Sequence, residues 1–175
     1  MATTSAQLTG RMAEAASALV AGLAATQQQA LTADLDDPAF RQWSYLPGPR
    51  DGLVLAELTE VQREAALTLL DTGCSAAGAR TARAVIELDL IRRQLGGGDP
   101  QPGDDRFWFR VFGDPATGAW AWRVNGHHLA VHVTVAGAAL TVTPSFFACA
   151  SCSAESVAGS ISTRFSSRAV RFASA

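Results

Sequence analysis

Hydrophobic positions in the N-terminal part of the chain follow the helical period of three to four residues. In the first run Met12, Ala16, Leu19 and Leu23 fall on one face, and the polar residues 27–29 continue it. This spacing predicts one long amphipathic helix that includes the polar residues. Asp36, Asp37 and Pro38 break the pattern, and a turn-rich loop with aromatic residues follows at 43–52.

Two further helices are predicted between this loop and residue 96. Thr59 and Gln62 have the spacing of a capping box, which begins the first of them, and Gly73 ends it. Ser75 can cap the next helix, which runs to about Leu95 and stops at a run of three glycines. The predicted apolar stripes are Leu58, Val61, Ala65 and Leu69 on the first helix, and Val85, Leu88, Ile91 and Leu95 on the second.

The pattern changes after Pro102 to short aromatic and β-branched runs, which are typical of strands. Four strands are predicted, at 107–112, 120–124, 127–135 and 138–143. Asn125-Gly126 is typical of a two-residue hairpin turn, which would place His127 beside Val124 and His128 beside Arg123.

Helices followed by consecutive strands predict an α+β fold, with N-terminal helices packed on an antiparallel β-meander. We expect residues 1–147 to form a single domain. The Ser-rich segment 148–175 sustains neither period, so we expect an irregular, poorly ordered tail.

Composition excludes several classes of function. The 175 residues carry a net charge of −2, which argues against nucleic-acid binding, and no apolar run reaches the ~20 residues that cross a membrane. All 14 basic side chains counted as Lys or Arg are Arg, which excludes Schiff-base chemistry on a lysine. Three cysteines make no disulfide framework in a chain of this length, and we expect a cytoplasmic protein.

The three histidines are the strongest chemical signal, because His127, His128 and His132 fall within six residues. In a strand, His127 and His128 would point to opposite faces, whereas His128 and His132 share a face but lie roughly 13 Å apart. A divalent metal would therefore need a ligand from another element, such as Glu87 or Asp89 with His128. The alternative is a histidine that packs on a tryptophan and bonds the backbone.

Arginines and aromatic residues suggest a second kind of chemistry. Arg50 and Arg123 could bind a carboxylate or phosphate, with Tyr45 in the same loop as Arg50. If the two segments pack together, the arginines need an anionic partner between them, either Glu87 or a ligand. Trp120 and Trp122 share a side of their strand and would form a pocket wall or part of the core.

The order of several motifs resembles the bacterial and fungal family catalogued as domain of unknown function 3500. The motifs are Trp43-Ser44-Tyr45-Leu46-Pro47 with Arg50 and Gly52, Gln62-Arg63, Phe112-Gly113-Asp114-Pro115, Trp120-Ala121-Trp122-Arg123, Gly126-His127-His128-Leu129 and Thr143-Pro144-Ser145-Phe146. The resemblance covers roughly Leu8 to Phe147. The family usually has Asn at the position of His132. It also continues after Phe146 with Gly-Ala-Asn-Pro and a long second half, so we expect a truncated or frameshifted chain.

Two hypotheses for function follow from these residues. The first is a hydrolase or lyase acting on a small polar or anionic substrate. In it His127 or His128 would serve as base or metal ligand, and Arg50 or Arg123 would hold the anionic group. The second is a non-catalytic ligand-binding or structural domain in which the Trp and His residues act as a brace. Small molecules are the expected partners in the first case, and the oligomeric state is open.

Overall fold

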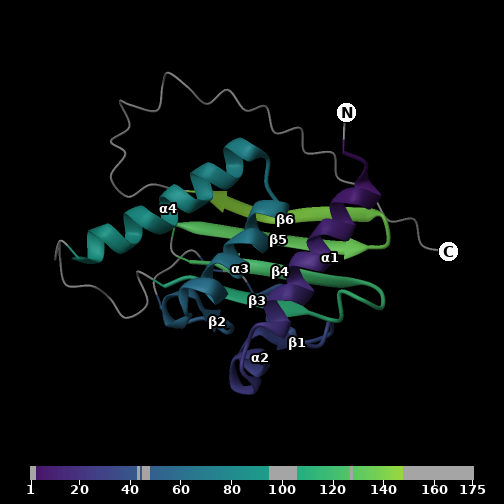
Figure 1. Cartoon of the computed structure of the whole chain (residues 1–175), viewed down its shortest axis with the longest axis horizontal. Helices are drawn as coiled ribbons and strands as arrows, with labels where there is room; N and C mark the ends of the chain where they lie inside the picture. The colour runs from purple at the N-terminus through teal and green to yellow at the C-terminus, as the bar shows by residue number, and fades with distance from the viewer. Residues whose placement is uncertain (1–2, 43, 45–47, 95–105, 127, 148–175) are drawn as a thin grey trace.

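The computed structural model of the protein describes residues 3–42, 44, 48–94, 106–126 and 128–147. Within them, four α-helices precede most of a mixed β-sheet, as the predicted α+β fold requires (Figure 1). The helices are α1 (Ser5–Ala21), α2 (Ala25–Leu31), α3 (Glu60–Thr72) and α4 (Ala76–Gln94), with short 3₁₀ turns η1 (Pro38–Arg41) and η2 (Leu55–Glu57). The strands are β1 (Thr32–Ala33), β2 (Leu53–Val54), β3 (Trp108–Phe112), β4 (Trp120–Asn125), β5 (Leu129–Ala136) and β6 (Ala139–Phe147).

Strands β3 to β6 form the predicted antiparallel meander, and two short strands extend it. The sheet order is β1-β3-β4-β5-β6, with β1 parallel to β3 and β2 antiparallel to β3. The sheet is therefore mixed. Both added strands are two residues long, too short for a period-two pattern to reveal them.

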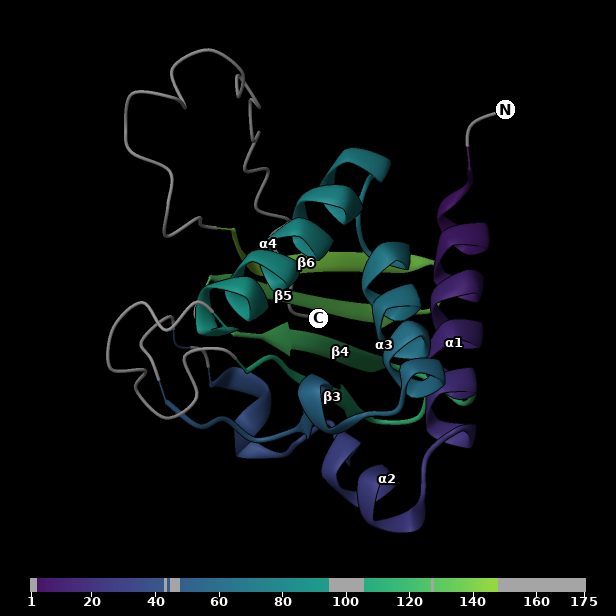
Figure 2. The ribbon, with the colours of Figure 1, turned by 60° about the vertical axis from the view of Figure 1, so that its left-hand side comes forward.

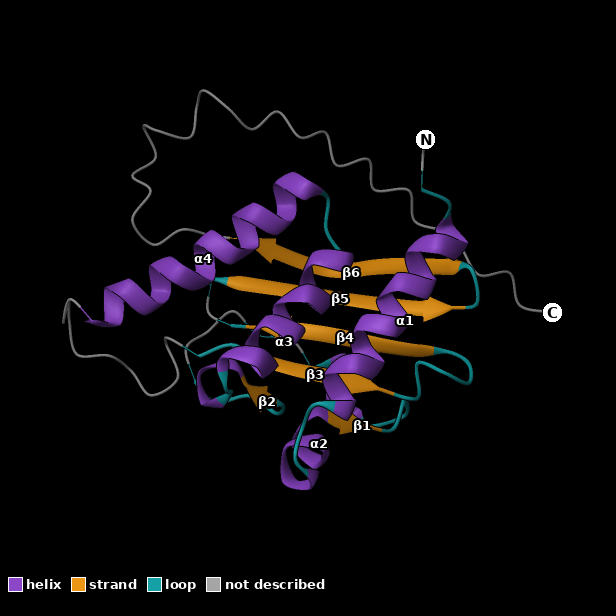
Figure 3. Ribbon diagram, viewed as in Figure 1, coloured by secondary structure: helices purple, strands orange, loops and turns teal. Residues whose placement is uncertain are grey.

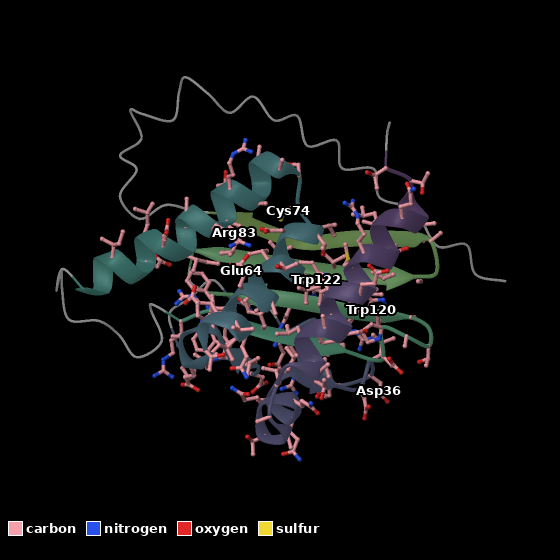
Figure 4. All side chains as sticks on the ribbon, viewed as in Figure 1. Asp36, Glu64, Cys74, Arg83, Trp120 and Trp122 are labelled. Atoms are coloured by element: carbon pink, nitrogen blue, oxygen red, sulfur yellow. The ribbon has the colours of Figure 1, made fainter. Side chains whose placement is uncertain are left out.

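Helices α1, α3 and α4 cover one face of the sheet (Figures 2 and 3). Alternate residues of β4 point toward them, so Trp120 and Trp122 are 1% and 0% exposed inside the main hydrophobic cluster. Figure 4 labels both residues where α1 and α3 cross the strands. The opposite face is different: Phe112 and Ala121 meet Ala39 there, in a small cluster beneath the segment that includes η1.

The predicted first helix is two helices. Gly22 ends α1, where its N–H bonds the carbonyls of the last turn, and α2 starts after Ala24. The Gln28 amide donates to the carbonyls of Val20 and Leu23, both at 3.0 Å. Gln28 therefore caps α1 from within α2, and the glutamine run does not prolong α1.

The buried faces of α3 and α4 also differ from the predicted stripes. On α3, Val61 is 82% exposed, and the helix buries Ala66, Leu67, Leu69 and Leu70. On α4, Leu88 and Ile91 are about half exposed, and the helix turns Ala82, Val85, Ile86 and Asp89 inward. Leu95 lies outside the described residues. The capping box at Thr59 and Gln62 is present as predicted, and Ser75 caps α4 through the Gly78 N–H.

The hairpin between β4 and β5 has a longer loop than predicted. Asn125 pairs with Ala130, and the Gly126 N–H donates to the Leu129 carbonyl at 2.7 Å. Consequently Arg123 lies opposite His132, not beside His128, and Val124 lies opposite Val131. The two strands pair as predicted, but the predicted register was wrong.

Residues 148–175 lie outside the described residues, so the predicted irregular tail remains an expectation. Within the part of the chain that the structure describes, no helix is both long enough and apolar enough to cross a bilayer.

Gly73 tests how tightly the helices pack on β4. A Cβ atom there would lie 2.4 Å from Cζ2 of the Trp122 ring, although the backbone conformation of Gly73 suits any residue. We expect Gly73→Ala to lower the free energy of unfolding by about 1–3 kcal/mol through overpacking.

Gly10→Ala is the matched control, because a Cβ at Gly10 meets nothing within 4 Å and the residue lies inside α1. It should raise stability by roughly 0.5–1 kcal/mol. Urea denaturation measures both, and a neutral Gly73→Ala would show that Trp122 is not held as described.

Candidate functional site

Three basic side chains stand in one row on the face of the sheet opposite the helices. Arg110 on β3 pairs with Arg123 on β4, which pairs with His132 on β5. Arg110 bonds the Ala30 carbonyl at 2.9 Å and lies 3.6 Å from Asp37. The row places two guanidinium groups and an imidazole side by side beneath the segment that includes η1.

Arg123 is the most buried of these charges, at 4% exposed. Its Nη1 donates to the carbonyls of Ala39 at 2.5 Å and Gln42 at 2.7 Å, and its guanidinium lies over the Phe112 ring. Burial lowers the pKa of Arg123, and the nearby Arg110 lowers it further. No carboxylate within the described residues lies at ion-pair distance from it. A positive charge is thus held in the fold with neutral partners.

Each member of the row has one buried nitrogen that lacks a hydrogen-bond partner within the described residues. These atoms are Nε of Arg110, Nε of Arg123 and Nε2 of His132. Buried polar atoms are rarely left in this state. A cavity of about 10 Å³, enough for one small atom or water, is lined by Arg123 and His132 among others.

A pocket of about 660 Å³ opens beside Arg123, the member of the row that belongs to its lining. It shares Gln42, Arg123 and Asn125 with the small cavity. Its described lining is mostly polar, with three arginines and one carboxylate: Arg41, Gln42, Ser44, Pro49, Arg50, Asp51, Arg123 and Asn125. Arg50 and Arg123, which the sequence analysis places in one candidate site, both line this pocket.

Arg50 is held rigidly at the pocket wall. Its Nε donates to Oδ1 of Asn125 at 3.1 Å, and its terminal nitrogens donate to the carbonyls of Gly48 and Ser44 at 2.7 and 3.0 Å. The guanidinium also lies 5.3 Å from the centre of the Trp108 ring. Burial lowers the pKa of Arg50.

Gly52 fixes the segment that carries Arg50 against β3. Its φ is +135°, and an added Cβ would lie 2.5 Å from the Phe109 carbonyl oxygen. Only glycine allows both the conformation and this close approach. The next residue, Leu53, then pairs with Phe109 in β2.

His128 and Asp89 form a second, separate feature. Nδ1 of His128 lies 2.8 Å from Oδ1 of Asp89, and the residues are 7% and 6% exposed. Asp89 reaches the histidine from α4, as one of the two acids expected there, whereas Glu87 is exposed. Neither His128 nor Glu87 is among the described residues that line the pocket, so Glu87 does not stand between the arginines.

The remaining sequence candidates divide into two groups. His127 and Tyr45 lie outside the described residues. Trp120 and Trp122 are buried under the helices, on the face away from the pocket, so neither ring is open to a ligand in this structure. Within the described residues no three His, Cys, Asp or Glu side chains gather as a set of metal ligands.

Several pocket residues carried no signal in the sequence that marks a binding site. Arg41 ends η1, Gln42 and Asp51 lie in loops, and Asn125 ends β4, and only the folded chain brings them to Arg50 and Arg123. Asn125 was interpreted as a turn residue, and it is instead a buried acceptor for Arg50.

The family model described as "Protein of unknown function (DUF3500)" matches residues 5–163, which is most of the chain. The chain belongs to the DUF3500 family. The match to the DUF3500 model continues past Phe147, where the resemblance in the sequence was placed to end. Comparison with curated proteins and with solved structures gives no match for this DUF3500 protein.

Asp89 and Glu87 give a paired test of the buried contact in this DUF3500 protein. Asp89→Ala would remove the buried carboxylate that bonds Nδ1 of His128, so we expect a loss of about 1–3 kcal/mol in the free energy of unfolding. Glu87→Ala, two positions away and exposed, should change it by less than about 0.5 kcal/mol. Equal effects in thermal or urea unfolding would contradict the described pairing.

His132 predicts a pH dependence of stability. Burial, with Arg123 adding to it, lowers the pKa of His132 from 6.5 to about 4. Between these values the unfolded chain binds more protons, so stability should fall as pH falls from 6.5 to 4.

The expected loss is on the order of 2 kcal/mol, after allowing for partial screening by solvent. The measurement is the difference between wild type and His132→Asn, which cannot titrate, in urea unfolding at pH 7 and pH 4.5. If that difference is the same at both pH values, His132 is not held neutral in the fold.

Proposed function

We propose that this protein binds a small anionic molecule, with a carboxylate or phosphate group, in the pocket between Arg50 and Arg123. The observation that carries the proposal is Arg123, a buried guanidinium with no carboxylate at ion-pair distance among the described residues. Burying an unpaired charge is costly, and a bound anion would offset that cost.

The arrangement of the pocket supports an anion over other ligands. The described lining holds three guanidinium groups and one carboxylate, a surplus of basic side chains in a protein whose net charge is −2. Arg50 is already oriented by three hydrogen bonds, and so little side-chain freedom remains to be lost on binding. The volume of about 660 Å³ suits a small metabolite.

A second candidate function is hydrolysis or elimination on such an anion, with His128 as general base. The observation that favours it is the hydrogen bond from the imidazole to Asp89, because a base oriented by a carboxylate is a common catalytic arrangement. Against it, both residues are buried and neither is among the described lining of the pocket. Binding without catalysis is the better-supported function, and His128 with Asp89 then serves as a structural brace.

Arg41 allows a test that spares the fold, since it lines the pocket and is exposed. Arg41→Gln should weaken binding of succinate or inorganic phosphate about three- to five-fold, because an exposed charge contributes up to about 1 kcal/mol. Titration calorimetry at constant ionic strength measures the affinity.

Arg11→Gln is the matched control, with the same charge change on the exposed surface of α1. It should leave the affinity unchanged. If wild type binds neither probe, or if both variants weaken binding equally, the pocket is not an anion site.

A further inference from the structure

Asp51 introduces a negative charge into a pocket that is otherwise basic. It lines the pocket next to Arg50 in the chain, and it is exposed. Among the described residues Asp51 takes part in no ion pair, so it neutralises neither Arg50 nor Arg123 by direct contact. Its carboxylate remains available to a ligand.

The position of Asp51 is built into the fold. Arg50, just before it, is tied to Asn125 and to two loop carbonyls, and Gly52, just after it, lies against the Phe109 carbonyl. A residue between two such anchors has little freedom to turn away from the pocket. Asp51 is also close enough to Arg123 to act on its charge, since it raises the pKa of Arg123 against the effect of burial.

A simple anion would meet a conflict in this pocket. Its negative group is attracted by Arg50 and Arg123 but repelled by Asp51, which has no cation at ion-pair distance among the described residues. A ligand that carries a positive group beside its acid removes the conflict. Such charge pairing also discriminates, because a ligand without the positive group leaves the carboxylate unpaired.

We propose that the ligand is a small amino acid, whose carboxylate binds between Arg50 and Arg123 and whose ammonium group pairs with Asp51. This inference rests on the proposed function, and it narrows the anion to a zwitterion. An amino acid with an acidic side chain fits best, because the three arginines exceed the one carboxylate by two charges in the described lining.

Three compounds with the same four-carbon dicarboxylate skeleton test the proposal. Succinate has no further group, malate has a hydroxyl and L-aspartate has an ammonium group at the same carbon. Titration calorimetry on the whole chain at constant ionic strength should give aspartate an affinity about five-fold higher than succinate or malate, as expected for one exposed charge pair.

Asp51→Asn should abolish this preference and strengthen succinate binding, since the repulsion is gone. Asp36→Asn is the control, because Asp36 is an exposed acid outside the described pocket lining (Figure 4) and its replacement changes the net charge equally. It should leave the order of affinities as in wild type. Unfolding midpoints of both variants confirm that each is folded.

The failures of the two proposals are distinguishable. If succinate, malate and phosphate bind but aspartate binds no better, or if Asp51→Asn keeps the preference for aspartate, the zwitterion is wrong and the anion site stands. If none of these compounds binds, the anion site itself is wrong.

Discussion

The two hydrogen bonds that Nη1 of Arg123 donates determine how the chain covers the face of the sheet opposite the helices. Its Nη1 donates to the carbonyls of Ala39 and Gln42, and these two bonds hold the end of η1 against β4. Phe40 on the same turn then meets Phe112 and His132 edge to face, at 5.4 and 4.9 Å between ring centres. A buried guanidinium thus attaches a loop to a sheet, and one wall of the pocket exists because of it.

The two faces of the sheet differ in the kind of interaction that covers them. Helices α1, α3 and α4 bury an apolar face, where Trp122, Val133 and Leu70 belong to one hydrophobic cluster. The other face is covered near β3 and β4 by a short segment that contributes few apolar side chains. Polar residues remain beneath that segment because backbone carbonyls are there to accept their hydrogen bonds. The pocket lined with arginines forms at the end of η1, where Arg41 and Gln42 contribute to its lining.

Periodicity and capping residues were enough to predict the fold class and the four long strands. They also predicted both ends of α3 and the start of α4. They failed where tertiary contacts override local pattern. On α4, Asp89 faces inward because His128 pairs with it, and Leu88, an apolar residue of the predicted stripe, is left about half exposed. The register of the β4–β5 hairpin depends on a loop whose length Asn125-Gly126 did not reveal.

The candidate site shows the same division. Arg50 and Arg123 stood out because each lies near aromatic residues, and they do share a pocket. The predicted cross-strand neighbour of Arg123 was His128, because the hairpin loop was assumed to be two residues long. In the structure the loop is longer, and the neighbour is His132. Asp51 and Arg41 could not be predicted, since nothing in the sequence of a loop or a short 3₁₀ turn states which strand that segment will meet.

The pocket beside Arg123 is proposed to bind an anion, and every other part of the proposed function depends on this. A crystal structure with selenate, at a concentration near the Kd that titration calorimetry gives for this ion, tests this directly through the anomalous signal of selenium. We predict a selenium peak in the pocket with oxygen atoms within about 3 Å of the guanidinium groups of Arg50 and Arg123. Ordered water in the pocket, with no selenium peak and both arginines unmoved, would contradict it.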